Sequence, residues 1–301
     1  MKIQAGGRTV ELSNPDKKLY PDDGLSKKDI ADYYQKISPW LLYHVKDRIL
    51  TMERYPNGIE EEGFVQQAAD NFDKVVKRRN VPRKDGSELE RILCSNAGCL
   101  VYLANLGVVT LHMWLSRVDA PEYADRMIFD LDPEGEDSGL VRRGSLYLRD
   151  LLEELGLRPF VMTTGSKGVH VVVPLRREKT FDEVRDFASE VASLLVRRHN
   201  DELTTEQRRK KRRGRLYIDV MRNGYGQTGV VPYTLRPVTK AAVATPLEWQ
   251  ELKDFRGTAR KYTYYNIFRR LAHKEDPWKN IGRHGRSLHN PMERLTTLRR
   301  L

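Results

Sequence analysis

A short apolar run that ends in two aspartates constrains the fold of this chain more than any other stretch. Residues 126–133 read Arg-Met-Ile-Phe-Asp-Leu-Asp-Pro. Side chains two positions apart leave the same face of a strand, so Asp130 and Asp132 would project together while Leu131 faces the core. Pro133 suits a strand end because it has no N–H to donate. Two adjacent carboxylates repel unless a cation lies between them, so the pair indicates a Mg²⁺ or Mn²⁺ site. The alternative is a strand end with two solvated acids.

The charge of the chain indicates a polyanionic partner. Its 301 residues carry 53 Lys and Arg against 42 Asp and Glu, a net charge of +11. This balance favours nucleic acid, with an anionic membrane as the alternative. No apolar run approaches the ~20 residues of a membrane helix, and the first residues lack the apolar core of a signal peptide. Two cysteines, Cys94 and Cys99, are too few for a disulfide framework and are expected to be ordinary thiols in a reducing compartment.

Strand and helix patterns alternate along the chain without a linker or an internal repeat. We therefore expect one domain over residues 1–301, possessing either one large core or two intimately packed lobes. A capping-box sequence at residues 26–29 predicts the start of a helix. Apolar patterns predict strands at 1–12, 48–52, 108–114, 160–164, 169–174 and 216–220, and residues 233–237 are a further strand candidate. Helical spacing and caps predict helices at 97–106, 140–155 and 180–199, and a short helix that opens at 245–248.

Two further stretches could join the paired aspartates in one site. The strand predicted at 216–220 carries a single carboxylate, Asp219. Three carboxylates on neighbouring strands can hold two divalent ions about 3.5–4 Å apart. Residues 165–168, Gly-Ser-Lys-Gly, form a tight turn that offers phosphates its backbone N–H groups, the Ser166 hydroxyl and the Lys167 ammonium. His170 follows in the next strand, where the alternative is a core histidine with no role in binding.

Lysines gather near a turn and a helix start in the N-terminal part. Lys17 and Lys18 precede the turn, while Lys27 and Lys28 open the helix. Helix N-termini attract phosphate, and clustered lysines strengthen that attraction. The alternative is a solvated basic corner.

The motifs resemble the signatures of the archaeo-eukaryotic primase superfamily. They are Phe-Asp-Leu-Asp-Pro at 129–133, Thr-Thr-Gly-Ser-Lys-Gly-Val-His at 163–170 and Tyr-Ile-Asp-Val at 217–220. Within it they resemble in particular the polymerase domain of ligase D, which acts in prokaryotic non-homologous end joining. Shorter matches in family order at 14–17, 54–58, 111–114, 232–236 and 245–249 extend the resemblance over nearly the whole chain. It implies an α/β (α+β) primase-polymerase fold: one catalytic domain of two interlocked lobes. A mixed, largely antiparallel central sheet would carry the acids, beside a second, small N-terminal lobe and flanking helices.

The resemblance also implies roles for individual residues. Asp130, Asp132 and Asp219 match the metal ligands of catalysis. Lys17 and Lys27 match lysines that hold the 5′-phosphate of a downstream DNA strand. The positions that match or adjoin nucleotide-binding residues are Phe64 (which would stack on a base), His112, Thr164, Ser166, Lys167, His170, Arg212 and Arg236.

The function implied is template-directed nucleotidyl transfer that fills gaps and extends 3′ ends at double-strand breaks. The family resemblance adds a preference for ribonucleotides, two Mg²⁺ or Mn²⁺ ions, and gapped DNA with a 5′-phosphate and nucleoside triphosphates as substrates. A separate DNA ligase and a Ku-type end-binding protein would be partners, in the nucleoid-associated cytoplasm of a prokaryote, with no membrane involved. Alternatives are a primase that makes primers de novo and a non-catalytic module that bridges DNA ends. A haloacid-dehalogenase-type phosphatase is disfavoured, because Glu134 stands where that class needs Thr or Val.

Two departures from the family pattern concern the nucleotide site. Relatives often carry two adjacent phenylalanines followed by Gln-Lys, whereas residues 64–67 here read Phe-Val-Gln-Gln. One stacking ring and one lysine are therefore missing. In addition, Glu53 precedes Arg54 where some relatives carry a basic residue.

Overall fold

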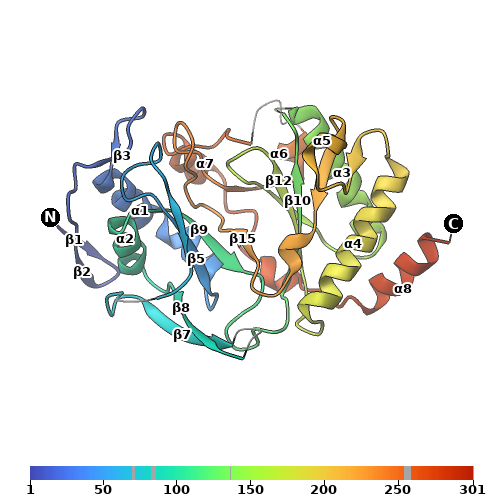
Figure 1. The fold of residues 1–301 in the computed structure, drawn as a ribbon, viewed down its shortest axis with the longest axis horizontal. Coiled ribbons are helices and arrows are strands. Elements are labelled where there is room, and N and C mark those ends of the chain that lie inside the picture. Colours follow the sequence, from blue (N-terminus) through green and yellow to red (C-terminus); the bar gives the residue numbers. More distant parts are fainter. Residues whose placement is uncertain (70–71, 83–85, 136, 254–258, 301) are drawn as a thin grey trace.

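Two six-stranded sheets, each with its own hydrophobic core, organise the computed structural model, which describes residues 1–69, 72–82, 86–135, 137–253 and 259–300 (Figure 1). We call them the acid-bearing sheet and the N-terminal sheet. Shorter elements surround them. These are the strand pairs β1 (Lys2–Ala5) with β2 (Arg8–Glu11) and β3 (Lys18–Tyr20) with β4 (Leu25–Ser26), together with α5 (Arg209–Arg212), η1 (Met221–Asn223), α6 (Trp249–Lys253), α7 (Ile267–His273), η2 (Ile281–His284) and α8 (His289–Leu298).

The acid-bearing sheet is mixed but largely antiparallel, as the sequence predicts. Its strand order is β13 (Leu203–Thr204), β14 (Leu216–Asp219), β10 (Arg126–Asp132), β12 (Val169–Pro174), β11 (Phe160–Thr163) and β16 (Thr245–Leu247). Only the β13–β14 pair is parallel among these described strands. Helices α3 (Ser138–Glu154) and α4 (Phe181–Arg198) pack against it, and their apolar sides share its core. β10 is therefore a central strand buried on its apolar side, which fixes the direction of its acids.

The N-terminal sheet is antiparallel throughout its described strands. Its order is β15 (Thr228–Val230), β9 (Val108–Trp114), β5 (Leu50–Arg54), β8 (Glu88–Leu93) and β7 (Lys77–Pro82), with β6 (Phe64–Gln66) paired to β5. Helices α1 (Lys27–Val45) and α2 (Ala97–Asn105) contribute to its core. This sheet has as many strands as the other, so the N-terminal lobe that it organises is larger than the small lobe expected. β15 comes from the C-terminal half of the chain, which interlocks the two halves.

A buried ion pair joins the start of β5 in the N-terminal sheet to the start of β10 in the acid-bearing sheet. Arg48 precedes β5 and is only 1% exposed, and it donates to both carboxylate oxygens of Asp125, just before β10, at 2.7 and 2.6 Å. Arg117 also donates to Asp125, at 3.0 Å. Arg126 lies beside them, and its burial and the charge of Arg48 lower its pKa to about 9. Asp125 thus compensates a cluster of arginines.

Local sequence signals predicted most element positions, and the exceptions have physical reasons. The capping box of Ser26 and Asp29 starts α1. The single strand expected at 1–12 is a hairpin, because Gly6 and Gly7 both adopt positive φ. Residues 233–237 form no ladder, since Tyr233 has a φ of +68° and Leu235 makes only an isolated bridge. The short helix expected to open at 245–248 begins at Trp249 as α6, and residues 245–247 before it form edge strand β16, where an edge tolerates the proline. No described helix is both long and apolar enough to cross a bilayer.

Candidate active site

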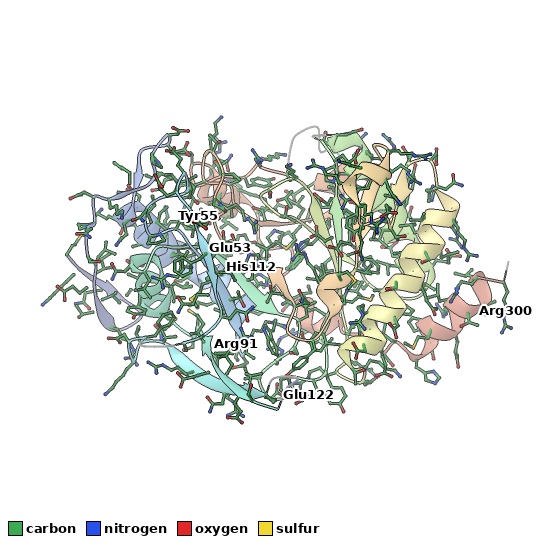
Figure 2. The ribbon with its side chains drawn as sticks, viewed as in Figure 1. Glu53, Tyr55, Arg91, His112, Glu122 and Arg300 are labelled. Atoms are coloured by element: carbon green, nitrogen blue, oxygen red, sulfur yellow. The ribbon has the colours of Figure 1, made fainter. Side chains whose placement is uncertain are left out.

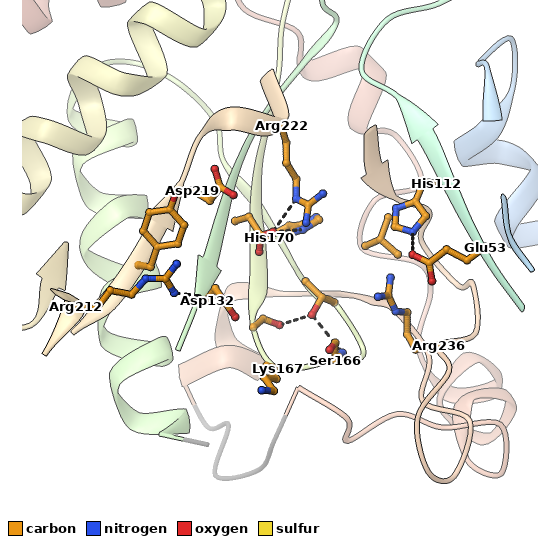
Figure 3. Close-up of a pocket in the computed structure, with 15 residues that line it drawn as sticks. Glu53, His112, Asp132, Ser166, Lys167, His170, Arg212, Asp219, Arg222 and Arg236 are labelled. Atoms are coloured by element: carbon orange, nitrogen blue, oxygen red, sulfur yellow. Dashed lines mark hydrogen bonds and ion pairs between the residues drawn. The ribbon is translucent and has the colours of Figure 1, made fainter. Parts of the chain in front are cut away.

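A polar cavity of about 420 Å³ lies between the two sheets (Figure 3). The acids of β10 and β14 form one wall, and Glu53 of β5 and His112 of β9 form the opposite one. Figure 2 shows that these last two side chains come from the N-terminal sheet. The lining residues are Glu53, His112, Asp130, Asp132, Thr164, Ser166, Lys167, Gly168, His170, Arg212, Tyr217, Asp219, Arg222, Val230 and Arg236.

Strand register brings the three predicted acids together. β10 and β14 are antiparallel neighbours, with Asp130 opposite Asp219 and Asp132 opposite Tyr217. The alternation of β10 sends Asp130 and Asp132 to the same face. The predicted convergence of the two acid-bearing strands is therefore present in the fold.

The Asp130 carboxylate is held by two basic side chains. Arg222 donates from Nε to Asp130 Oδ2 at 2.7 Å, and His170 Nε2 lies 3.5 Å from the same oxygen. Burial alone would raise the pKa of Asp130, but His170 and Arg222 lower it well below its usual range. Asp130 is therefore ionised at neutral pH.

The other two carboxylates have different partners. Burial and the charge of Asp130 raise the pKa of Asp132, against the effect of Arg212, whose Nη1 lies 3.5 Å from its Oδ2. Asp219 accepts the backbone N–H of Met221 at 2.8 Å. Burial would lower the pKa of Arg222, yet the charges of Asp130, Asp219 and Asp132 raise it. The guanidinium of Arg222 thus lies in the field of all three acids.

The donor set fits a hard divalent cation by its chemistry. Three carboxylates face one cavity, and oxygen ligands of this type suit Mg²⁺ and Mn²⁺. Within the part of the chain that the structure describes, however, no group of three or more His, Cys, Asp or Glu side chains is arranged to enclose an ion. Arginines compensate Asp130 and Asp132 instead. Asp130, Asp132 and Asp219 are therefore candidate ligands whose side chains are not gathered around one point.

The predicted phosphate turn packs directly against the acid strand. Thr164 closes it by donating from N and Oγ1 to the carbonyl of Gly168, at 3.1 and 3.0 Å. A Cβ at Gly168 would lie 2.0 Å from the carbonyl oxygen of Leu131, so only glycine fits this approach. Lys167 is exposed at the tip. The turn therefore presents its N–H groups and its ammonium beside the β10 carboxylates.

His112 and Glu53 form a hydrogen-bonded pair on the opposite wall. His112 Nε2 lies 2.6 Å from Glu53 Oε1. Burial lowers the pKa of His112 despite the neighbouring carboxylate, whereas His112 lowers the pKa of Glu53 against the effect of burial. We infer a neutral imidazole whose Nε2–H donates to an ionised carboxylate. His112 Nδ1 is buried and has no protein partner among the described residues.

Two arginines complete the basic side of the cavity. Arg212 donates to the carbonyls of Glu206 and Gln207 at 3.1 and 3.0 Å and lies over the ring of Tyr217, 4.0 Å from its centroid. Arg236 also lines the cavity. The predicted residues His112, Thr164, Ser166, Lys167, His170, Arg212 and Arg236 thus meet the three acids in one place.

Three predicted residues lie outside this lining. Phe64 on β6 is 48% exposed, and the guanidinium of Arg54 lies 5.1 Å from its ring centroid. Lys17 donates to Asn57 Oδ1 at 2.8 Å. Lys27 is 6% exposed, and its pKa is lowered by burial and by the charge of Lys17, which places the two ammonium groups near each other. Neither lysine forms an ion pair with a carboxylate of the described residues, so no such pair neutralises their charges.

Sequence reasoning did not assign four lining residues: Glu53, Tyr217, Arg222 and Val230. Tyr217 could have been found, because it lies two positions before Asp219 and shares its face of the strand. Arg222 follows the strand in η1, where no periodicity indicates a direction. Glu53 was noted only as a departure from the family pattern, since its place in the cavity depends on how the two sheets face each other.

Comparison with known proteins identifies related chains. The model of the family "LigD, primase-polymerase domain" matches residues 26–278. A multifunctional non-homologous end joining protein LigD of Mycobacterium bovis is 32% identical over 282 residues, which are 90% of this chain and 37% of the relative. The bifunctional LigD of Bacillus subtilis is 28% identical over 81% of this chain and 40% of its own length. The chain therefore spans little more than a third of these relatives.

A solved structure has the same fold. The polymerase domain of Mycobacterium tuberculosis ligase D, in complex with DNA, superposes with a TM-score of 0.85 at 30% sequence identity. The match covers 92% of this chain and 99% of that domain.

Proposed function

Because this chain belongs to the LigD primase-polymerase domain family and is a nucleotidyltransferase by class, we propose that it fills gaps and extends 3′ ends at DNA double-strand breaks in non-homologous end joining. The observation that carries this proposal is the meeting of three carboxylates, a phosphate-type turn and several cationic side chains in one cavity. Both sheets supply lining residues, which supports residues 1–301 acting as a single catalytic domain. A filled break still needs end alignment and sealing, so a Ku-type end-binding protein and a DNA ligase are the partners we propose.

The charges in the cavity indicate which residues would bind metal and which would bind the triphosphate. Asp130, Asp132 and Asp219 would hold two Mg²⁺ or Mn²⁺ ions, which supply positive charge at the attacking 3′-hydroxyl and at the leaving pyrophosphate. Lys167 and the N–H groups of its turn bind triphosphate oxygens, Arg212 and Arg236 add positive charge around them, and the imidazole of His170 lines the same part of the cavity. The chain thus acts by positioning and electrostatics, without a covalent intermediate.

The base and sugar would be held away from the acids. His112 and its partner Glu53 lie on the opposite wall, where a nucleotide bound through its phosphates places its sugar. Phe64 offers an exposed ring for stacking, and stacking accepts any base. An enzyme of this design suits DNA ends of arbitrary sequence.

Extension of a primer across a gap tests the function. With a 5′-phosphorylated gapped duplex and either Mg²⁺ or Mn²⁺, we expect template-dependent addition, and ATP should be incorporated in preference to dATP when both are present at equal concentration. Product lengths on a sequencing gel measure the extension, and cleavage of the products in alkali measures the share of ribonucleotides incorporated. Absence of extension with either metal would refute the polymerase, and equal use of ATP and dATP would refute the ribonucleotide preference. Synthesis on a template that lacks a primer would favour the primase alternative.

The lysine pair near α1 is proposed to bind the 5′-phosphate at the far side of the gap. Replacing Lys17 by Ala and Lys27 by Met removes both ammonium groups and keeps most of the buried stem of Lys27. Charge-assisted contacts to phosphate contribute about 1.5–3 kcal/mol each, so the preference for phosphorylated over hydroxyl gaps should fall about tenfold or more. Competitive binding of the two gaps, followed by fluorescence anisotropy, measures the preference.

Lys18 provides the matched control for this pair. It lies next to Lys17 in sequence, but its ammonium donates to the carbonyl of Gly24 at 2.7 Å. Lys18→Ala should therefore retain the preference. If the double variant still discriminates the two gaps as the wild type does, the assignment of the lysines is wrong.

A further inference from the structure

Arg222 enters the cavity from the turn after β14 and holds the carboxylate of Asp130. Its Nε donates to Asp130 Oδ2 at 2.7 Å, and its Nη1 donates to the carbonyl of Thr228 at 3.3 Å. In Figure 3 the side chain reaches from η1 toward His170, on the same wall as Asp219. The guanidinium therefore occupies a place beside the acids that would hold metal.

The fold builds this position. Asn223, the residue after Arg222, is fully buried, and its side chain pairs with the backbone of Ile128 on β10: it accepts from the N–H at 2.8 Å and donates to the C=O at 2.7 Å. Asp219 accepts the N–H of Met221 from the other side of the turn. The backbone around Arg222 is thus attached to both acid-bearing strands. The guanidinium of Arg222 can therefore leave Asp130 by rotation of its side chain, without movement of this backbone.

The arginine and a divalent ion would compete for the same carboxylate. A guanidinium bonded to Asp130 Oδ2 repels a divalent ion that approaches the same carboxylate, so the two cations compete for it. Guanidinium groups pair with phosphate as well as with carboxylate. A bound triphosphate in this cavity would therefore offer Arg222 another anion.

We infer that Arg222 is an exchangeable counter-ion, which closes the Asp130 carboxylate to divalent metal until the triphosphate of a nucleotide draws the guanidinium away. The inference rests on the proposed function, because it requires a triphosphate in this cavity. Its consequence is an order of binding: the cavity binds metal weakly while nucleotide is absent and binds it tightly together with nucleotide. Arg222 is a positioning residue in this scheme, since it acts through Asp130.

Titration of the whole protein with Mn²⁺, in the absence of nucleotide and DNA, tests the counter-ion. Free Mn²⁺ is read from its electron paramagnetic resonance signal. Arg222→Gln removes the charge and keeps a polar side chain, so it should bind Mn²⁺ about tenfold or more tightly than the wild type. Arg222→Met, which also lacks the charge, should behave in the same way and serves where Gln alters the circular dichroism spectrum.

Arg236→Gln is the matched control for this titration. Arg236 lines the same cavity, but it forms no ion pair with any of the three acids among the described residues. Its replacement removes one positive charge without freeing Asp130 and should change Mn²⁺ affinity by less than about threefold. An Arg222→Gln affinity within threefold of the wild type, or equal tightening in Arg236→Gln, would overturn the inference.

A second titration measures the exchange itself. A non-hydrolysable ATP analogue should increase the Mn²⁺ affinity of both proteins. The increase should be about ten times larger in the wild type than in Arg222→Gln, because only the wild type has a guanidinium that can move from Asp130 to the triphosphate. Equal factors would also refute the exchange. The first titration needs neither nucleotide nor extension, so a protein that extends primers but shows no Arg222 effect loses only this inference. A protein that fails to extend loses the proposed function.

Discussion

Replacement of Asp130 by Asn is expected to lower the rate of primer extension by about 10³-fold or more. Asp130 lies opposite Asp219 in the β10–β14 register, and its carboxylate is ionised between His170 and Arg222. Asn keeps the shape but loses the charge that a divalent ion requires, and enzymes lose rate on this scale when such a charge is removed at the reacting atoms. Single-turnover extension of a gapped substrate measures the effect.

The loss should be confined to chemistry. DNA affinity, followed by anisotropy, is expected to change less than about threefold, because the basic surface is unaltered. Asp150→Asn is the matched control, since Asp150 is an exposed acid of α3 outside the cavity, and it should extend at the wild-type rate. Extension by Asp130→Asn within tenfold of the wild type would contradict the catalytic role.

Replacement of Asp125 by Asn is expected to lower the free energy of unfolding by about 3–5 kcal/mol. Asp125 is the carboxylate partner of buried Arg48 and of Arg117, beside buried Arg126. Without its charge, buried Arg48 and Arg126 lose their carboxylate, and Arg48 keeps only the carbonyls of Trp114 and Ser116 as acceptors, which costs more than the loss of a hydrogen bond. Equilibrium unfolding in urea at neutral pH measures the change.

The pH dependence of stability offers a second readout for this variant. Burial would raise the pKa of Asp125, but the charge of Arg48 lowers it below the ordinary value. The ionised carboxylate therefore contributes fully to the free energy of unfolding above the ordinary aspartate pKa of about 3.9. This contribution is lost as the pH falls through the lower pKa that Asp125 has in the folded state. The difference between the wild type and Asp125→Asn should shrink in that acidic range.

An exposed ion pair provides the control. Asp119 pairs with Arg177 at 2.5 Å, but both side chains are well exposed to solvent. Asp119→Asn should therefore cost less than about 1 kcal/mol, since solvent screens such pairs. A loss below 1 kcal/mol for Asp125→Asn would mean that water or backbone relaxation compensates the buried arginines.

The parts of the site that could be predicted from sequence are those set by local rules. Alternation along 126–133 gave the common direction of Asp130 and Asp132, and apolar continuity gave the bounds of β9 and β12. The contribution of Arg222 was not predictable, because it depends on Asn223 bonding to a strand that lies far away in sequence. The strand candidate at 233–237 was wrong for another reason. Its sequence has a high strand propensity, but Tyr233 adopts a positive φ because tertiary hydrogen bonds outweigh that propensity.

The passage of the chain from β14 to β15 restrains how the cavity works. Asn223 bonds to Ile128, and a Cβ at Gly229 in β15 would lie 2.5 Å from the side chain of Ile128, so this segment is closely packed on β10 before it joins the N-terminal sheet. β15 consequently connects the two walls of the cavity, because it packs on β10 and also belongs to the N-terminal sheet. A wide hinge opening, like that of a hand, would have to break these contacts. In the proposed function, discrimination between nucleotides would therefore depend on rotations of side chains in the cavity rather than on a wide opening of its walls.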